Sequence, residues 1–122
     1  MYKASTNIGL KNIEEVYFKN IVFSDNAIIP LEASECNKLR IIDISNSSFS
    51  GVNCGPTVES LNLFGTPITT INYSNLPSLK TLVLGNNPNL TSIVLNNCPK
   101  LESLIIPPTV TSLTIINCKS LK

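Results

Sequence analysis

Histidine and tryptophan are absent from this 122-residue sequence, and aromatic and charged residues are scarce. Aromatic residues make up 6% of the chain and charged residues 14%, against about 25% charged residues in an average protein. Without histidine, and with carboxylates that form no motif with a neighbouring nucleophile, the chain lacks the usual parts of a hydrolase or transferase site. We therefore predict that the protein is not an enzyme and that it needs no cofactor or metal ion.

The charge and hydropathy patterns exclude two further classes of partner. The net charge is +1 and the lysines are scattered singly, so no basic surface is expected for nucleic acid or for an anionic membrane. No stretch reaches the roughly 18 apolar residues of a membrane span. The N-terminus, MYKASTNIGL, has no signal-peptide apolar core, which leaves open whether an export signal was removed or never present. We predict no nucleic-acid partner and no membrane insertion.

An apolar pattern with the spacing L-x-x-L-x-L recurs along the whole chain in two interleaved series. The first series reads Ile13/Val16/Phe18, Leu39/Ile42/Ile44, Val58/Leu61/Leu63, Leu79/Leu82/Leu84 and Leu101/Leu104/Ile106. The second reads Phe49/Val52/Cys54, Ile68/Ile71/Tyr73, Leu90/Ile93/Leu95 and Val110/Leu113/Ile115. The last two residues of each triplet are two apart, so they point to the same side of a strand. Each turn of roughly 20 residues is therefore expected to contain two short strands.

The composition of these segments argues against long helices. They are rich in Ile, Val, Thr and Ser, and prolines interrupt them at short intervals. Two places remain open to a helical interpretation. The apolar spacing of residues 9–19 fits a helix or a strand, and Pro30 could begin a short helix over residues 30–38. The sequence predicts a solenoid that is mostly β, with two short strands per coil and little helix, whose stacked coils share one core.

Residues 98–113, CPKLESLIIPPTVTSL, resemble the BspA-like branch of the leucine-rich-repeat family. That branch alternates a C-x-x-L-x-x-I-x-I-P strand with a V-x-x-I strand. The resemblance is close over residues 76–121, looser over 36–73 and weak over 1–35. The Gly and Ala-Phe positions that are usual in the second segment of the family are missing here, which implies a shortened second segment.

The resemblance implies a leucine-rich-repeat solenoid with one domain, residues 1–122. Residues 1–35 would be an N-terminal cap region and residues 36–122 the regular repeats. The last coil, from Val110 to Leu121, is as apolar as the internal ones, so the C-terminal end is expected to lack a polar cap. For function, the resemblance implies a surface adhesin or another recognition protein, at the cell surface or outside the cell.

The four cysteines are expected to be buried small side chains. They form no CxxC pair and have no histidine partner, which argues against a zinc site. Cys98 and Cys118 occupy the same repeat position as Leu76 and Cys36, so this position is expected to be apolar. The alternative is a Cys98–Cys118 disulfide between stacked coils.

Asparagines recur at fixed places in the repeat. Asn75, Asn97 and Asn117 each precede the cysteine or leucine position, where their amides are expected to cap backbone groups at a corner of the coil. A separate set opens N-x-S/T triplets, which are either glycosylation sites or chance matches in a chain rich in Asn and Ser. This set is Asn46, Asn72 and Asn89.

The outward positions of the first-series strands carry the candidate binding residues. Several of them are apolar, and exposed apolar patches often mark partner sites; the alternative is an ordinary scatter of apolar residues over a surface. The candidate partner-binding residues are Tyr17, Ile41, Asp43, Phe64, Val83 and Ile105, together with Ile116 on the last coil. The outward positions of the second series are mostly small and polar, and they look less like a binding face.

Two function classes follow from these expectations. The first is a recognition module that binds a protein or a glycan through the first-series sheet. The second is a structural or decoration subunit of a larger assembly, which packs through its solenoid ends and contacts another chain end to end.

Overall fold

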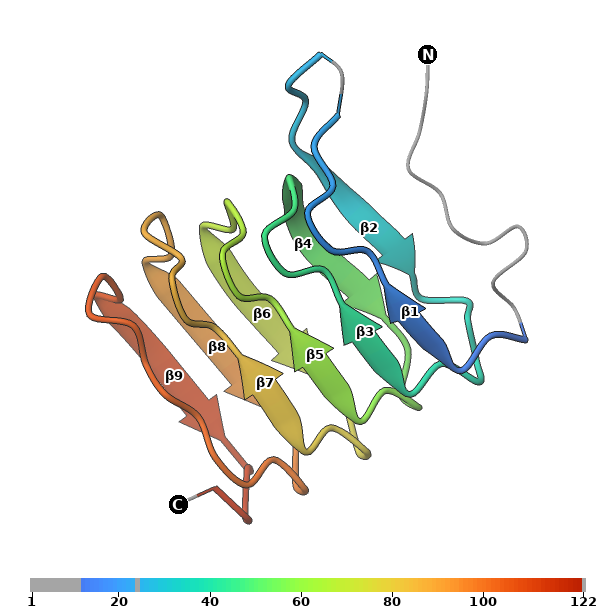
Figure 1. Ribbon diagram of the computed structural model, residues 1–122. Coiled ribbons are helices and arrows are strands. Elements are labelled where there is room, and N and C mark those ends of the chain that lie inside the picture. The colour runs from blue at the N-terminus through green and yellow to red at the C-terminus, as the bar shows by residue number, and fades with distance from the viewer. Residues whose placement is uncertain (1–11, 24, 122) are drawn as a thin grey trace.

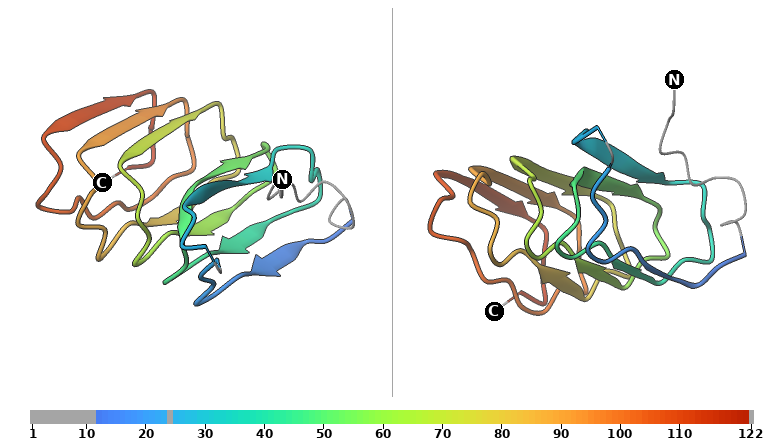
Figure 2. Two further views of the ribbon diagram at one scale, coloured as in Figure 1. Left: turned by 90° about the horizontal axis from the view of Figure 1, so that it is seen from above. Right: turned by 45° about the horizontal axis from the view of Figure 1, so that its top comes forward.

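The computed structural model describes residues 12–23 and 25–121. The chain is an all-β solenoid of about four turns of about 21 residues each, and no helix is present among the described residues. The strands form two layers that face each other across the coil (Figure 1 and Figure 2). Every strand pair is parallel, because each strand pairs with the equivalent segment of the next coil.

The first layer is one sheet, which we call the first sheet. Its order is β1-β3-β5-β7, and its register aligns Val16, Ile42, Leu61 and Leu82 at the centres of successive strands. The strands are β1 (Glu15–Tyr17), β3 (Ile41–Asp43), β5 (Ser60–Asn62) and β7 (Thr81–Val83). The expected fifth strand over residues 101–106 is reduced to a single bridge between Thr81 and Ser103.

The second layer is divided into two sheets. One pairs β2 (Ile29–Ala33) with β4 (Phe49–Cys54), and the other has the order β6-β8-β9. The strands of the latter are β6 (Thr70–Ser74), β8 (Ser92–Asn96) and β9 (Ser112–Ile116). The sequence predicted the strands of this layer from β4 onwards, but not the break between β4 and β6.

The helical interpretation of residues 30–38 is wrong, because Ile29–Ala33 forms strand β2. Leu31 and Ala33 are buried, while Pro30, which precedes them in the strand, is exposed. Proline is accepted in a strand at a sheet edge, and β2 pairs only with β4 among the described strands. The helical option for residues 9–19 is also wrong where the chain is described, since β1 is a strand; residues 9–11 lie outside the described residues.

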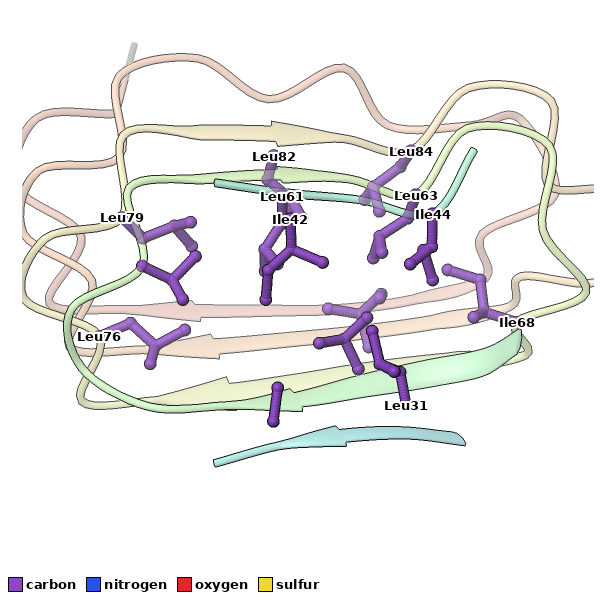
Figure 3. Close-up of a cluster of buried hydrophobic side chains, with 14 of the residues drawn as sticks. Leu31, Ile42, Ile44, Leu61, Leu63, Ile68, Leu76, Leu79, Leu82 and Leu84 are labelled. Carbon is purple, nitrogen blue, oxygen red and sulfur yellow. The ribbon is translucent and has the colours of Figure 1, made fainter. Parts of the chain in front are cut away.

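The predicted apolar triplets form the core between the two layers (Figure 3). Side chains of Ile42, Leu61 and Leu82 stack in one column of the first sheet, and Leu31 points into the core from the opposite layer. Nearly all triplet residues of the three middle coils are fully buried. Because one coil cannot cover its own apolar edge, this shared column of Leu and Ile is what joins the coils.

Asparagines occupy the tight corners of the coil. Asn75, Asn97 and Asn117 have φ angles of 58°, 62° and 54°, in the left-handed region that asparagine tolerates better than most residues. The predicted corner positions are therefore confirmed. The predicted capping of backbone groups by these amides is not confirmed. Instead, Asn97 Nδ2 donates to Asn75 Oδ1 at 2.8 Å, which links the side chains of two neighbouring coils.

Charged residues of alternating sign form a row across the first sheet, one on each coil just before the strand begins. Backbone hydrogen bonds join Arg40 N to Glu14 O at 2.7 Å, Glu59 N to Arg40 O at 2.7 Å and Lys80 N to Glu59 O at 2.8 Å. Glu102 N continues the column by donating to Lys80 O at 3.3 Å. Arg40 also forms ion pairs with the carboxylates of Glu14 and Glu59 on the two flanking coils. Opposite charges on neighbouring strands favour this register over a slipped one.

Candidate functional site

The first sheet presents apolar side chains outward, as the alternation predicts. Tyr17 and Phe64 are exposed, Ile105 is 84% exposed, and Ile41 and Val83 are half-buried. We call these five residues the sheet face: Tyr17, Ile41, Phe64, Val83 and Ile105. They lie on successive coils from β1 to the bridge at Ser103, so the candidate surface extends along the solenoid.

The ring of Phe64 lies against the neighbouring coil. A Cβ atom added at Gly85 would lie 3.1 Å from Phe64 Cδ2, so the ring covers the backbone of Gly85. The backbone N–H of Phe64 donates to Asn62 Oδ1 at 3.1 Å, which fixes the turn that follows β5. Phe64 is therefore held in place from both sides while part of its ring remains exposed.

Tyr17 adds a polar hydroxyl group to the sheet face. Its hydroxyl donates to Glu15 Oε1 at 2.8 Å, and Lys19 Nζ lies 5.8 Å from the centre of its ring. The hydrogen bond to Glu15 is the main reason why the pKa of Tyr17 is raised, with smaller contributions from partial desolvation and the negative charges of Glu15 and Asp43.

Asp43 is buried, which corrects the prediction of an exposed side chain at this candidate position. It is only 8% exposed. Its Oδ1 accepts the backbone N–H of Ser45 at 2.9 Å, Asn62 Nδ2 donates to its Oδ2 at 3.3 Å, and Lys19 Nζ lies 3.7 Å away. Burial alone raises the pKa of Asp43, but the hydrogen bonds from Ser45, the charge of Lys19 and the amide of Asn62 outweigh it and lower the pKa overall. Asp43 is thus a turn residue of the coil.

The last coil exposes the side chains that inner coils bury. All five residues of β9 are exposed, among them Leu113, Ile115 and Ile116. Ile115 pairs in register with the fully buried Leu95, yet it is 38% exposed because no described strand lies on the outer side of β9. β9 is therefore the outermost described strand of its sheet, and its apolar side chains are exposed. Ile116 is exposed, as predicted.

A cleft lies on the second layer where that layer divides. It encloses about 220 Å³ and is lined mainly by β4 and β6, including Gly51, Val52, Asn53, Thr70 and Asn72. The hydroxyl of Tyr73 donates to the carbonyl of Val52 at 2.8 Å across the break. Sequence reasoning missed this cleft. Its one signal was Tyr73, a large polar-ended residue at a repeat position that elsewhere holds Cys54, Leu95 or Ile115.

The cysteines carry no disulfide in the described part of the chain, which includes all four of them. Cys36 and Cys98 are fully buried, in agreement with the prediction, whereas Cys54 and Cys118 are half-buried. Burial, assisted by the nearby Cys98, raises the pKa of Cys54 to about 12, so its thiol is protonated at neutral pH and unreactive.

The described residues contain no group of three His, Cys, Asp or Glu side chains placed to hold a metal ion. None of their segments is a helix long and apolar enough to cross a membrane.

Comparison with known proteins finds no matching family model, no similar curated protein and no similar solved structure. The solenoid fold therefore rests on the repeat and on the geometry described above.

Proposed function

We propose that this solenoid is a non-catalytic recognition module that binds a protein or a glycan through the sheet face. The observation that carries the proposal is the placement of Phe64, whose partly exposed ring is fixed over Gly85 beside the outward side chains of the adjoining coils. A rigid aromatic residue loses little conformational freedom on binding, and aromatic residues are enriched at the energetic centres of interfaces.

We further propose that the repeat is of the BspA-like leucine-rich type. Support comes from the motif in residues 98–113, from the parallel strands of the first sheet, and from the cysteine position buried between coils. A surface or extracellular location belongs to the same proposal and rests on the resemblance alone.

The test uses two charged variants of the chain as baits in native cell extract. Val83→Lys combined with Ile105→Lys places two charges on the sheet face, and Ser92→Lys is the control on the outer side of the second layer. We expect the wild type and the control to retain the same partner and the double variant to lose it. The melting temperature should stay within a few degrees, as is usual for surface substitutions. A partner kept by the double variant and lost with Ser92→Lys would place binding on the other layer.

A second candidate function is a structural subunit that packs through its solenoid ends. It is favoured by the exposure of all five residues of β9, which has no described strand on its outer side, because such an apolar edge is a template for another strand. The two candidates use different surfaces, so variants of the sheet face and of the last coil separate them.

A further inference from the structure

The break between β4 and β6 leaves two strand edges facing each other. On the same two coils, β3 and β5 pair in register, so the coils themselves are neighbours. In the second layer β4 pairs only with β2, and β6 pairs only with β8, among the described strands. The N–H and C=O groups on the facing edges of β4 and β6 therefore have no strand partner.

The backbone hydrogen bonds of β6 and its flanking residues show which groups face the break. Thr91 N donates to Thr69 O at 3.0 Å and Asn75 N donates to Asn96 O at 2.9 Å, so alternate residues of this segment point toward β8. The residues between them, Thr70 and Asn72, must direct their N–H and C=O groups toward β4, because these groups alternate in direction along a strand.

Tyr73 keeps the break open from the core side. It pairs in register with Leu95 on the next coil, but its ring is larger and its hydroxyl reaches the carbonyl of Val52. A backbone N–H of β6 would be the natural donor to that carbonyl if the sheet were continuous. The hydroxyl replaces one bond of the ladder, and the remaining groups of the edge have no partner strand among the described residues.

A bulge in β4 widens the same place. Ile29 pairs with Phe49 and Leu31 with Val52, so β4 contains one more residue than β2 between these pairs. Gly51 lies within the bulge, and no atom lies within 4 Å of the position where its Cβ would be. The cleft therefore has an open wall that any larger residue would partly fill.

The size and lining of the cleft indicate the class of ligand. Its volume of about 220 Å³ is below the roughly 300–1,000 Å³ typical of pockets for small molecules and cofactors. Two facing strand edges instead match the main chain of an extended peptide, which can donate to and accept from both sides.

A carboxylate on β2, which is hydrogen-bonded to the cleft residue Asn53, adds a preference for charge. Asn53, which lines the cleft, donates from Nδ2 to Glu32 Oε2 at 2.8 Å, and the hydroxyl of Ser34 donates to Glu32 Oε1 at 2.7 Å. The hydrogen bonds from Ser34 and then Asn53 lower the pKa of Glu32, so its charge is present at neutral pH. A lysine or arginine next to the bound segment would meet this charge.

We propose that the cleft between β4 and β6 accepts an extended, lysine- or arginine-bearing peptide segment of a partner protein as an added parallel strand. This site is independent of the sheet face and lies on the opposite layer. The added strand would complete the second layer by bonding to Thr70 and Asn72 on one side and to the edge of β4 on the other.

Amide hydrogen exchange of the full chain, followed by NMR, tests the proposal. The probes are acetylated heptapeptides of alternating Thr and Val, Thr and Ala, or Thr and Ser, each with one terminal Lys. Without peptide, the amides of Thr70 and Asn72 should exchange faster than those of Ile71 and Tyr73. At saturating peptide, their exchange should slow at least tenfold. The same peptides with N-methylated alternate residues should not protect them.

The charge preference is tested with two carboxylate variants. Glu32→Gln should weaken peptide binding several-fold at low salt, whereas Glu35→Gln in the exposed turn after β2 should leave it unchanged. The proposal is overturned if Thr70 and Asn72 are already protected in the peptide-free chain. It is also overturned if no peptide protects them, or if N-methylated peptides bind equally well. Protection of these amides by neutral oligosaccharides but not by peptides would assign the cleft to a glycan instead.

Discussion

At the scale of single residues, Tyr73 shows how one side chain changes the local architecture. Leu95 occupies the equivalent position of the next coil, where β6 and β8 pair along their full length. Tyr73 is mostly buried, and its hydroxyl bonds to Val52 in place of a ladder partner. Burial is also the main reason why the pKa of Tyr73 is strongly raised, so the phenol stays protonated and remains a donor.

We predict that Tyr73→Phe destabilises the chain by about 1 kcal/mol, because a partly buried carbonyl of Val52 loses its donor. Urea unfolding measures the difference. Tyr17→Phe is the matched control, since the Tyr17 hydroxyl bonds to an exposed carboxylate of Glu15, and it should leave the free energy of unfolding nearly unchanged. An unchanged free energy of unfolding for Tyr73→Phe would show that the Tyr73 hydroxyl has no structural role.

Asp43 shows why an alternation pattern alone misplaces some residues. Its position in β3 is outward, as predicted, but its carboxylate folds back to the N–H of Ser45. Asn62 makes the equivalent bond to the N–H of Phe64 on the next coil. Asp and Asn have short side chains that can accept a hydrogen bond from the backbone N–H two residues later. The residue types at these two positions therefore already indicated a turn in the sequence.

At the scale of elements, the apolar periodicity of the sequence predicted most of the strands. The exceptions depend on local chemistry that this periodicity does not report. The triplets were predicted because core residues repeat on every coil. Strand β2 was missed because Pro30 suggested a helix start, although an edge strand accepts proline equally well. The reduced fifth strand of the first sheet could not be predicted, since Leu101, Leu104 and Ile106 fit the triplet as well as any other.

The corners of the coils lead to a prediction at Gly65. Gly65 has a φ of 70°, and a Cβ there would clash with Asn46 Oδ1 on the preceding coil. Gly65→Ala should therefore destabilise the chain by about 1–2 kcal/mol, through the left-handed backbone and the contact with Asn46. Thermal and urea unfolding measure the loss.

Asn86 provides the control for that corner. It holds a φ of 54° at the equivalent corner of the next coil. Asn86→Gly should change the stability by only a few tenths of a kcal/mol, because glycine adopts this conformation freely. A tolerated Gly65→Ala would mean that the corner relaxes to another backbone conformation.

At the scale of the whole molecule, the sequence predicted a solenoid with one continuous core but not the division of its second layer. The repeat specifies what each coil buries, and that information is local to about 20 residues. Whether two strands pair also depends on local features of single coils, and here the ring of Tyr73 and the bulge at Gly51 both lie at the break. The alternation of side chains along a strand was enough to predict the sheet face. The cleft could not be predicted, because it depends on how two neighbouring coils pack in three dimensions.

The last coil leads to a prediction about association of the 122-residue chain. Leu113, Ile115 and Ile116 are exposed, and the outer edge of β9 is unpaired among the described strands. Covering these side chains with another chain would bury apolar surface and complete the hydrogen bonds of the edge. We expect the chain to self-associate as its concentration rises, and Ile116→Lys to weaken this association about tenfold or more.

Sedimentation velocity over a concentration series measures that association, and thermal unfolding checks that the variant remains folded. Ile116 is a better position than Ile115, because Ile115 lies in the core column of Leu95 and a lysine there would also disturb the fold. Asn89→Lys adds the same charge at an exposed position outside β9 and should leave the association unchanged. A wild-type chain that stays monomeric at the highest concentration would contradict the packing of this end against another copy. If Asn89→Lys dispersed the assemblies as effectively as Ile116→Lys, net charge rather than contact through β9 would control association.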